Sequence, residues 1–566
     1  MDNINTSTAK SPNPSLNTYS RMATLILASF SVIVAWVVWR ITRNLFIRSP
    51  LDNVPGPSSG SYIKGHLPQL FAVDGWEFIN RLGTKYNKVV KLNGLMGHRM
   101  LYVFDPTALH QIIIKDSEVY ENPEWSLESM RMTMGPGLLG VHGARHRKQR
   151  KMLNPVFSIK HMRSMTPLFY GIANKMVTGI GREVGNDQAT VNILDWFGRT
   201  ALELIGQCGL GTSLDTLEEP EPNPLGDAVK EFLPAAFTMS EFQFLLKYAK
   251  NFGPGWFRAA LLDILPVPGL QRIKGLVNKI ASESVNVLTQ KRAALKAGDE
   301  VLLKQVGEGK DIMSILLRAN MAASEEDRLP DDELLGQMCL LVLAGTDTTS
   351  NAMTTMMDLL ARNVAIQDKL RAEIVEAQAQ YGSEIPYDEL VALPYMDAIC
   401  RETLRLYPPG MMIWREAQKD NMLQLSQPII GVDGKTVNEI FIPAGTSIMV
   451  AIRAVNRDRS IWGDDALEFK PERWLSPLPP SVTEARIPGV YSNLMTFNGG
   501  GRACIGFKFS QLEMKVVLTT LISKFKVSLA ENADEVEWNA SAVRYPSVGK
   551  SGGRPEYPIK LKRIRV

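Results

Sequence analysis

Several common catalytic signatures are missing from this sequence of 566 residues. It contains no CxxC and no HExxH, and its six histidines all lie before residue 162, which argues against a zinc site. Its cysteines are few and far apart, so we expect no disulfide framework and a reducing compartment. The net charge of +4 is too weak to imply nucleic acid, and we expect no such partner.

Phosphate-binding signatures are also missing, although one stretch comes close to them. The segment FNGGGRACIGFKFS, residues 497–510, places Cys504 among four glycines and an arginine. A Walker loop needs Lys and then Ser or Thr after its last glycine, but Phe507 and Lys508 follow Gly506. A dinucleotide fingerprint needs a third glycine where Cys504 stands. An isolated cysteine is most often a buried structural residue, but such a cysteine requires neither these glycines nor Arg502.

Charged residues are absent from residues 22–39, MATLILASFSVIVAWVVW. As a helix this run is roughly 27 Å long, about the thickness of a membrane core. A cleaved signal peptide is the alternative, but no small-residue cleavage site follows the run. More Arg and Lys residues follow the run than precede it, which favours a cytosolic C-terminal side. We predict a single-pass anchor in the endoplasmic reticulum membrane, with Asn5 as a lumenal candidate for glycosylation.

The remaining chain shows no repeat and no composition shift, so we expect one catalytic domain that is mainly α with a minor β-sheet region. Residues 87–106 alternate around a turn and predict a β-hairpin, and residues 421–450 contain further strand-like runs. The predicted divisions are a polar lumenal segment at 1–21, the membrane helix at 22–39, a basic and Pro/Gly-rich hinge at 40–60, and the catalytic domain at 61–566.

A long apolar helix is predicted over residues 334–363, with AGTDTTS in its middle. Thr348 and its neighbouring hydroxyls can bond to preceding carbonyls and open the helix locally. Asp347 is expensive to bury without a partner or a task. A solvated kink is the ordinary alternative, but the apolar flanks argue against it.

Three further motifs are commonplace when each is taken alone. Glu402 and Arg405 share a helix face in RETLR, and Arg473 lies in KPERW, where surface salt bridges are the default interpretation. His146 and Arg150 belong to the basic run GARHRKQRK, which is usually a solvated helix face.

Their order along the chain is much more specific. A-G-x-D-T-T is followed by E-x-x-R, then P-E-R, then F-x-x-G-x-R-x-C-x-G. In this the chain resembles the cytochrome P450 family of haem-thiolate monooxygenases, in particular its microsomal eukaryotic members and a fungal style of sequence. The resemblance covers essentially the whole chain beyond the anchor and implies the cytochrome P450 fold.

The resemblance also implies how haem, the iron protoporphyrin cofactor, is held. Cys504 corresponds to the axial thiolate ligand of the iron, with Phe497 shielding the sulfur from water. Gly500 and Gly506 would let the backbone curl and aim amide groups at the sulfur. The residues that correspond to propionate-binding positions are Arg502, Arg150, Arg415 and His146, the last standing where the family most often has tryptophan.

The same resemblance gives the polar residues of the long helix a catalytic role. Thr348 corresponds to the hydroxyl that relays protons, and Asp347 to the carboxyl that links it to solvent. Glu402, Arg405 and Arg473 correspond to a structural charge network that supports the haem-binding core.

The implied activity is insertion of one oxygen atom from O₂ into an apolar small molecule, by hydroxylation, epoxidation or O-dealkylation. Aromatic or polycyclic xenobiotics, terpenoids and steroids are the expected substrate classes, in xenobiotic or secondary metabolism. By analogy, residues 122–140, 232–257 and 410–414 face the substrate, and they are rich in Met, Phe, Trp and Leu. Expected partners are NADPH–cytochrome P450 reductase, cytochrome b5 as a second electron donor, and membrane lipid. A haem-thiolate isomerase or dehydratase and a membrane-anchored haem sensor stay open as alternatives.

Overall fold

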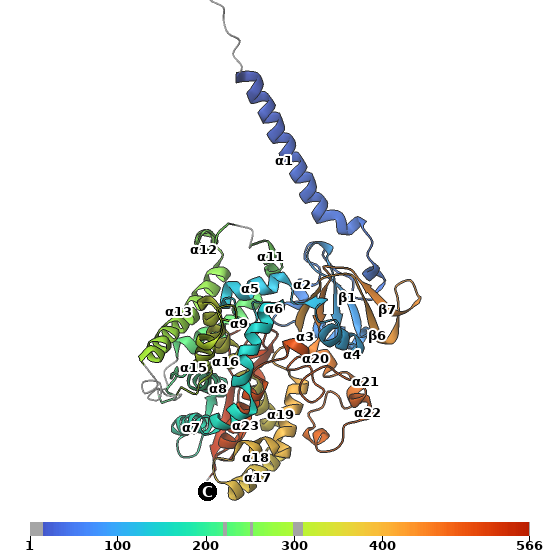
Figure 1. The fold of residues 1–566 in the computed structure, drawn as a ribbon. Coiled ribbons are helices and arrows are strands. Elements are labelled where there is room, and N and C mark those ends of the chain that lie inside the picture. The colour runs from blue at the N-terminus through green and yellow to red at the C-terminus, as the bar shows by residue number, and fades with distance from the viewer. Residues whose placement is uncertain (1–14, 219–222, 250–252, 298–308, 565–566) are drawn as a thin grey trace, which may run out of the picture.

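The computed structural model describes residues 15–218, 223–249, 253–297 and 309–564. Helices form most of the body, and small sheets lie at its edges (Figure 1). This confirms the mainly α architecture with a minor β-sheet region. The helices of eight or more residues are α1 (Ser15–Phe46), α3 (Trp76–Lys85), α5 (Glu124–Met134), α6 (Gly143–Leu153), α7 (Ile159–Val184), α8 (Ile193–Leu204), α9 (Pro224–Thr238), α12 (Gly255–Ile264), α13 (Pro268–Ala297), α15 (Ile312–Ala322), α16 (Asp331–Arg362), α17 (Val364–Tyr381), α19 (Pro394–Leu406) and α23 (Phe507–Ile522).

Short helical segments connect these elements. The short α-helices are α2 (Leu67–Leu70), α4 (Pro106–His110), α10 (Ser240–Gln243), α11 (Leu246–Ala249), α18 (Tyr387–Ala392), α20 (Ile452–Val455), α21 (Arg459–Trp462) and α22 (Pro480–Thr483). Two other turns matter for the site: η5 (Ile205–Leu210), a π-helical continuation of α8, and η7 (Gly500–Arg502), a 3₁₀ turn just before Cys504.

The largest sheet has five strands in the order β1-β2-β8-β5-β3. Its first two strands are the predicted hairpin, paired antiparallel with Val89 opposite Val103. The predicted strand-like region at 421–450 contains β6, β7 and β8, so that expectation is confirmed as well. The strands are β1 (Val89–Asn93), β2 (Arg99–Val103), β3 (Tyr120–Glu121), β4 (Gln188–Asn192), β5 (Ile413–Ala417), β6 (Asn421–Ile430), β7 (Thr436–Ile442), β8 (Ser447–Val450), β9 (Phe525–Leu529), β10 (Val536–Asn539), β11 (Tyr545–Val548) and β12 (Pro558–Arg563).

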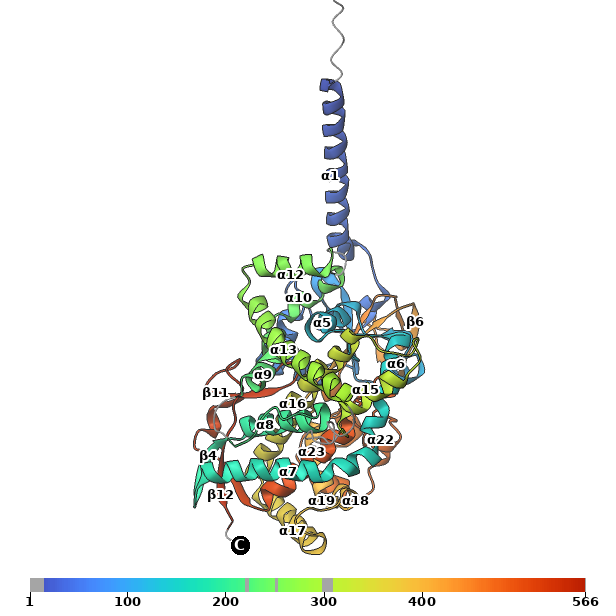
Figure 2. The same cartoon turned by 60° about the vertical axis from the view of Figure 1, so that its left-hand side comes forward.

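The long helix α16 passes through the centre of the body and packs against α8, α9, α13 and α23 (Figure 2). Its bounds are close to the predicted 334–363, and the helix continues unbroken through AGTDTTS. The Thr348 hydroxyl donates to the carbonyl of Ala344 over 2.7 Å, and Thr354 and Thr355 bond in the same way to the preceding turn. The bonds expected to open the helix are thus present, yet α16 remains one continuous helix, so the predicted local opening is not seen.

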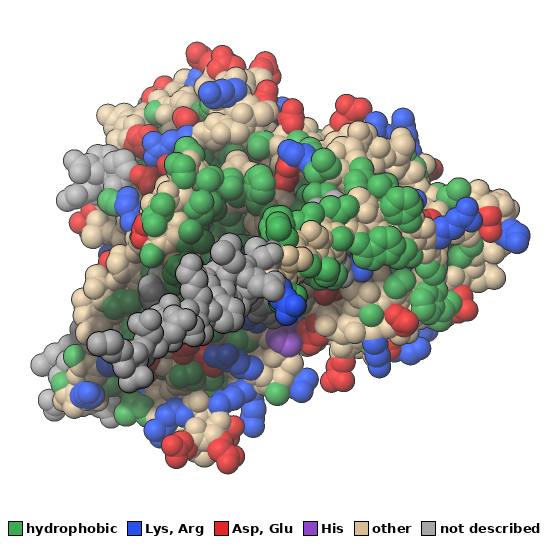
Figure 3. Space-filling view, turned by 90° about the horizontal axis from the view of Figure 1, so that it is seen from above, with side chains coloured by type: hydrophobic (Ala, Val, Ile, Leu, Met, Phe, Trp, Pro, Cys, Tyr) green, Lys and Arg blue, Asp and Glu red, His purple; other side chains and the backbone are tan. Residues whose placement is uncertain are grey.

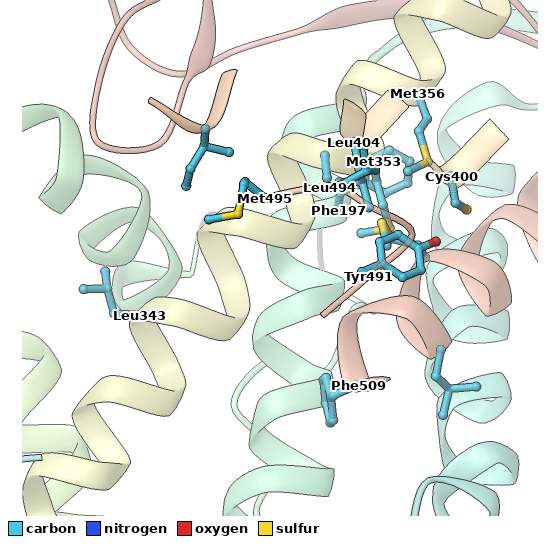
Figure 4. Close-up of a cluster of buried hydrophobic side chains, with 14 of the residues drawn as sticks. Phe197, Leu343, Met353, Met356, Cys400, Leu404, Tyr491, Leu494, Met495 and Phe509 are labelled. Carbon is cyan, nitrogen blue, oxygen red and sulfur yellow. The ribbon is translucent and has the colours of Figure 1, made fainter. Parts of the chain in front are cut away.

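Apolar side chains from several helices meet beside α16. Figure 4 shows Phe197 of α8, Met353 and Met356 of α16, Leu404 of α19 and Phe509 of α23 in one buried cluster. This packing fixes α16 relative to α19, which carries Glu402 and Arg405, and to α23, which follows the cysteine loop. The core therefore positions the two halves of the candidate site.

The predicted membrane helix lies within α1, which projects from the body and leaves its apolar side chains exposed, among them Ile26 and Phe30 (Figure 1). Figure 3 shows further apolar side chains on the face around its base, and α10 and α12, which carry the exposed Phe242 and Ile264, lie near that base in Figure 2. Over the described residues, none of the helices meets the combined length and apolarity required to cross a membrane, so the spanning part of the prediction is not supported. Asn5 lies outside the described residues.

Candidate active site

Cys504 lies in a tight loop between η7 and α23. Its backbone N–H donates to the carbonyl of Phe497 over 2.8 Å, and this bond closes the loop. Asn498 adopts a left-handed conformation with φ of 57°, and its side chain donates to the carbonyl of Arg502 over 3.1 Å. The loop is therefore shaped by its own hydrogen bonds. Asn498 is one of the residues that the motif alone did not identify.

The glycines around Cys504 are not equivalent. A Cβ on Gly499 would lie 1.8 Å from the carbonyl oxygen of Pro488, and Gly500 has a φ of +62° with Ile113 O at 2.5 Å from its hypothetical Cβ. Nothing lies within 4 Å of a Cβ at Gly501. Both close approaches are to backbone atoms, so neither Gly499 nor Gly500 can carry a side chain. The amide-orienting role expected for Gly500 stays a prediction, and Gly499 is a further residue that only its place in the GGG run could have indicated.

The sulfur of Cys504 differs from those of the other cysteines, which are buried. Cys504 is exposed, although burial in the surrounding protein still raises the pKa of its thiol. The backbone N–H of Gly506 and the charge of Arg150 act in the opposite direction and favour the thiolate. The sulfur thus faces open space inside the body, where a ligand can approach it. Gly506 acts through its amide, as expected, and is not sterically required.

A cavity of about 410 Å³ lies beside this loop and collects basic side chains. Its lining holds five permanent cations and two carboxylates, Glu118 and Glu121. These cations come from separate parts of the chain, because α6, β5 and η7 each contribute to the wall. The basic residues in the wall are His146, Arg147, Arg150, Lys151, Arg415 and Arg502.

Of three guanidinium groups in this cavity, two have neutral partners and the third is paired with a carboxylate. Arg150 donates to the carbonyl of Ala503, next to the cysteine, over 2.5 Å. Arg415 donates to the side chain of Asn122 over 2.7 Å. Arg502 forms the ion pair with Glu121, at 3.0 Å. Arg502 and Arg150 thereby attach the cysteine loop to β3 and α6.

The cations in the cavity repel one another. Burial, followed by repulsion from Arg502, lowers the pKa of Arg415 to about 10. Burial, followed by repulsion from Arg502 and Arg150, lowers the pKa of His146 to about 4. His146 is therefore neutral at physiological pH and can donate one N–H without adding charge. An anion is needed to offset the remaining cations.

The arrangement fits the predicted haem. Two propionate carboxylates would offset part of the surplus of positive charge in this cavity, and the guanidinium groups of Arg150, Arg415 and Arg502 favour bidentate bonds to carboxylate. Cys504 would supply the sulfur ligand of the iron, and the Gly506 amide would donate a hydrogen bond to that sulfur. Each residue that the resemblance implied for haem therefore lies in the cavity or in the cysteine loop beside it.

One face of α16 is open where the rest of the helix is buried. Ala344 is exposed, and Gly345 and Thr348 are half-buried, although most of the flanking residues are fully buried. Thr348 lies three residues after Gly345 and four after Ala344, so these positions share one side of the helix. A Cβ on Gly345 would lie 2.4 Å from Cδ1 of Ile205 in η5, so the glycine permits close packing there.

Asp347 lies next to this face and is itself 4% exposed. Its Oδ1 accepts a hydrogen bond from Asn351 over 3.1 Å. Burial raises the pKa of Asp347 to about 7, although the charge of Lys230 and the Asn351 bond both act to lower it. The carboxyl therefore exchanges its proton close to neutral pH, as a proton-relay group must. Lys230, from α9, is a second residue that no sequence motif marked.

Glu402, Arg405 and Arg473 come together behind the cysteine loop. Arg405 binds both carboxylate oxygens of Glu402 at 2.8 Å, and neither side chain is exposed. Arg473 reaches the same carboxylate at 3.4 Å, and Trp474 donates to it over 3.0 Å. This buried network joins α19 to the segment around residue 473, whereas an isolated surface pair would contribute little.

Aromatic rings from the three segments predicted to face substrate form one cluster. Trp125 of α5 lies 4.6 Å from Phe244 and 5.3 Å from Trp414 of β5, measured between ring centroids. Phe71, after α2, also stacks on Trp414, at 6.4 Å. Neighbouring rings at these distances and tilts pack favourably. The structure thus joins segments 122–140, 232–257 and 410–414 through one cluster of aromatic rings.

Comparison with known proteins agrees with this geometry. The family described as Cytochrome P450 matches residues 55–547. Cytochrome P450 monooxygenase 91 of Postia placenta is 51% identical over 94% of this chain and 97% of its own length. The ganoderic acid synthetase of Ganoderma lucidum is 43% identical over the same shares of the two chains, 94% and 97%. A cytochrome P450 monooxygenase of Hericium erinaceus is 33% identical over 94% of this chain and 96% of its own length. This chain belongs to the cytochrome P450 family of haem-thiolate monooxygenases.

Proposed function

We propose that the enzyme inserts one oxygen atom from O₂ into an apolar small molecule, with Cys504 as the ligand of its haem iron. The observation that carries this is the cation-rich cavity beside the exposed sulfur of Cys504. When bound, the haem supplies the iron at which O₂ is reduced, and thiolate ligation favours O–O cleavage. The protein's part is to hold the carboxylates through Arg150, Arg415 and Arg502 and to supply protons.

Thr348 and Asp347 are proposed to supply those protons. The Thr348 hydroxyl lies on the open face of α16, and its bond to Ala344 fixes the direction of its lone pairs. Asp347 titrates near neutral pH, so it can release a proton and regain one within each turnover. The pair favours an O₂-reducing enzyme over a haem-thiolate isomerase or dehydratase, which consumes no protons in this way.

The substrate is proposed to be an apolar ring compound: an aromatic or polycyclic xenobiotic, a terpenoid or a steroid. The aromatic wall of Trp125, Phe244 and Trp414 supports this, because flat rings offer area and no charge to a ligand. Hydroxylation, epoxidation and O-dealkylation are the reactions proposed for it.

Electrons must come from a redox partner, as is general in the family. NADPH–cytochrome P450 reductase is proposed as that partner, with cytochrome b5 as a second donor. The sequence contains neither a phosphate-binding loop nor a dinucleotide fingerprint, which supports an external source of electrons.

We also propose that α1 attaches the enzyme to the endoplasmic reticulum membrane, with the catalytic body in the cytosol. The exposed apolar side chains of α1, and those around its base, support contact with lipid (Figure 3). Glycosylation of Asn5 reports the topology. A chain that crosses the bilayer once acquires a glycan at Asn5. An endoglycosidase removes this glycan, and the Asn5→Gln variant lacks it. An unglycosylated but membrane-bound chain would instead indicate attachment at the surface.

The function is tested by purifying the enzyme with a fungal reductase and measuring NADPH consumption and products over a panel of apolar compounds. Oxygenated products containing ¹⁸O from ¹⁸O₂ are expected. The reduced enzyme with carbon monoxide should show the red-shifted band of sulfur coordination, and Cys504→Ser should lose it. Rearranged or dehydrated products without ¹⁸O would indicate the isomerase, and haem binding without turnover of any compound would indicate the sensor.

A further inference from the structure

We propose that a second cluster of arginines, outside the cavity beside Cys504, binds a small oxyanion of the phosphate class. The cluster consists of Arg453 on α20, Arg457 just after that helix, and Arg544 in the turn between β10 and β11. None of the three lines the cavity beside Cys504. The site goes beyond the proposed function, which assigns the haem carboxylates to other arginines and needs no second anion.

Backbone hydrogen bonds bring two of these arginines to one short stretch of chain. The N–H of Arg544 donates to the carbonyl of Pro409, and the N–H of Arg453 donates to the carbonyl of Met411, each over 3.1 Å. Two residues that are far apart in the sequence are thereby anchored two positions apart on the segment that follows α19.

Aromatic rings hold the guanidinium groups of the cluster. Arg544 Cζ lies 3.8 Å from the ring centroid of Trp538 and 4.7 Å from that of Tyr407. Arg457 Cζ lies 5.9 Å from the same Tyr407 ring, so Arg544 and Arg457 share one ring. Ring faces attract cations, but they leave the N–H groups in the guanidinium plane available for hydrogen bonds.

The third arginine joins the same group through a pair of tryptophans. Arg453 Cζ lies 4.9 Å from the ring centroid of Trp76. The Nε1–H of Trp76 donates to the carbonyl of Trp538, the residue on which Arg544 stacks. The three guanidinium groups therefore belong to one cluster of stacked cations and rings.

These cations have no carboxylate partner. Over the part of the chain that the structure describes, none of the three forms an ion pair. The Arg453 side chain instead donates over 2.6 Å to the neutral amide of Asn80, from α3, which lies beside α20 in Figure 1. Arg544 Nε and Nη1 and Arg457 Nη1 are buried and have no hydrogen-bond partner among the described residues. Buried donors of this kind require a partner, and charged donors most of all.

The three cations also repel one another. Burial, followed by repulsion from Arg457 and Arg544, lowers the pKa of Arg453 to about 9. Burial lowers the pKa of Arg544 to about 10, although the charge of Asp358 acts in the opposite direction. Asp358 is already paired with Arg362 at 2.6 Å. The arginines stay protonated at neutral pH, so an anion is the partner that relieves both the repulsion and the unbonded N–H groups.

The exposure of the cluster suits a small free ion. Arg453 and Arg457 are half-buried, whereas Arg544 is 5% exposed. An anion can therefore enter past the first two arginines and bind the third from the solvent side. Guanidinium forks match the spacing of phosphate oxygens and bind them through charge-assisted hydrogen bonds. A lipid headgroup that stays in the bilayer cannot reach Arg544, so we expect a free ion.

The test is a calorimetric titration of the full-length holoenzyme with inorganic phosphate, with the ionic strength held constant by sodium chloride. The haem carboxylates occupy the other arginine cluster in this preparation. We expect one saturable phosphate per chain, and a rise of about 3 °C in the thermal midpoint when phosphate is about a hundredfold above its dissociation constant. Arg544→Met should weaken phosphate binding at least about tenfold and leave the haem spectrum unchanged.

A second variant and a matched control keep the test decisive if Arg544→Met fails to fold. Arg453→Gln removes a half-buried cation and should also weaken phosphate binding about tenfold. Arg163→Gln removes an exposed arginine that is paired with Asp388 on another surface, and it should keep the wild-type affinity.

Three results would overturn the proposal. The first is the absence of saturable phosphate binding, which would mean that water satisfies the buried N–H groups. The second is phosphate binding that is unchanged in Arg453→Gln, which would place the ion elsewhere. The third is a rise in the thermal midpoint with phosphatidate vesicles but not with inorganic phosphate, which would indicate a lipid headgroup in place of a free ion.

Discussion

The two sides of the active site are built by different means. On the cysteine side, the backbone itself makes the site: Gly499 and Gly500 touch other backbone atoms, and the Glu402 network closes behind the loop. On the α16 side the backbone is a regular helix, and the chemistry of Asp347 depends on what other helices bring to it. The first side excludes side chains at Gly499 and Gly500, whereas the second can be retuned by exchanging single side chains.

This difference sets an order of sensitivity. A steric clash with backbone atoms cannot relax. A broken buried ion pair leaves one charge without its partner. A change at a buried carboxyl that makes no close contact alters mainly the proton affinity of the site. Substitutions on the two sides should therefore separate clearly in size and in pH dependence.

Gly499→Ala should have the largest effect. Its Cβ would lie 1.8 Å from Pro488 O, and neither backbone can move without opening the loop. We expect a loss of ~5 kcal/mol or more in the free energy of unfolding, with little haem-loaded protein recovered. Haem content and denaturant midpoints measure this. Gly501→Ala, with nothing within 4 Å, is the control and should change stability by less than ~1 kcal/mol.

Glu402→Gln should follow, with a loss of ~4 kcal/mol in the free energy of unfolding. The substitution keeps the shape of the side chain but leaves the fully buried Arg405 without its counter-ion. Denaturant unfolding of the holoenzyme provides the measurement. A change below ~1 kcal/mol would place this network among ordinary surface pairs.

Asp347→Asn should show a smaller effect that depends on pH. Because burial raises the pKa of Asp347 to about 7 in the folded protein, the folded state holds more protons than the unfolded state between about pH 4 and 7. As the pH rises through this window, the buried Asp347 carboxyl ionises and the free energy of unfolding of the wild type falls. The variant has no carboxyl to ionise there, so its free energy of unfolding does not fall in this way. The variant should gain ~3 kcal/mol relative to the wild type between pH 5 and 8. Parallel unfolding curves at the two pH values would contradict this.

Gly345→Ala should have the smallest effect of the four. Its Cβ would meet Ile205 at the end of a flexible side chain, which can turn aside, and alanine favours the helix by ~1 kcal/mol. The two effects nearly cancel, so we expect a net change within ~1 kcal/mol of zero. Thermal unfolding measures it. A loss as large as that of Gly499→Ala would show that α16 is as intolerant as the cysteine loop.

The difference between the two sides of the active site also explains which structural features could be predicted from the sequence. The hairpin at 87–106, the helix around Asp347 and the loop at Cys504 leave local patterns, namely alternation, apolar length and glycines at fixed places. These features were predicted close to their observed bounds. The meeting of Arg150, Arg415 and Arg502 came from the family resemblance, because no local pattern brings α6, β5 and η7 together.

Other features could not be predicted because they depend on tertiary packing. Lys230 and Asp195 look like ordinary surface charges in the sequence, and only the packing of α8 on α9 directs the lysine inward. Gly499 and Gly501 are neighbours in the same run, yet only the first touches another backbone. The Thr-rich middle of α16 suggested a local opening, but the helix is continuous there even though Thr348 bonds to the carbonyl of Ala344.

The crowding of cations around His146 has a consequence for how much of the enzyme a cell accumulates. Mutual repulsion among these guanidinium groups weakens the cofactor-free chain, and binding of a dianionic cofactor restores stability by mass action. Newly made chains that wait for haem are then the ones most exposed to proteolysis. We expect the yield in a heterologous host to rise with the supply of a porphyrin precursor, even when transcript levels are unchanged.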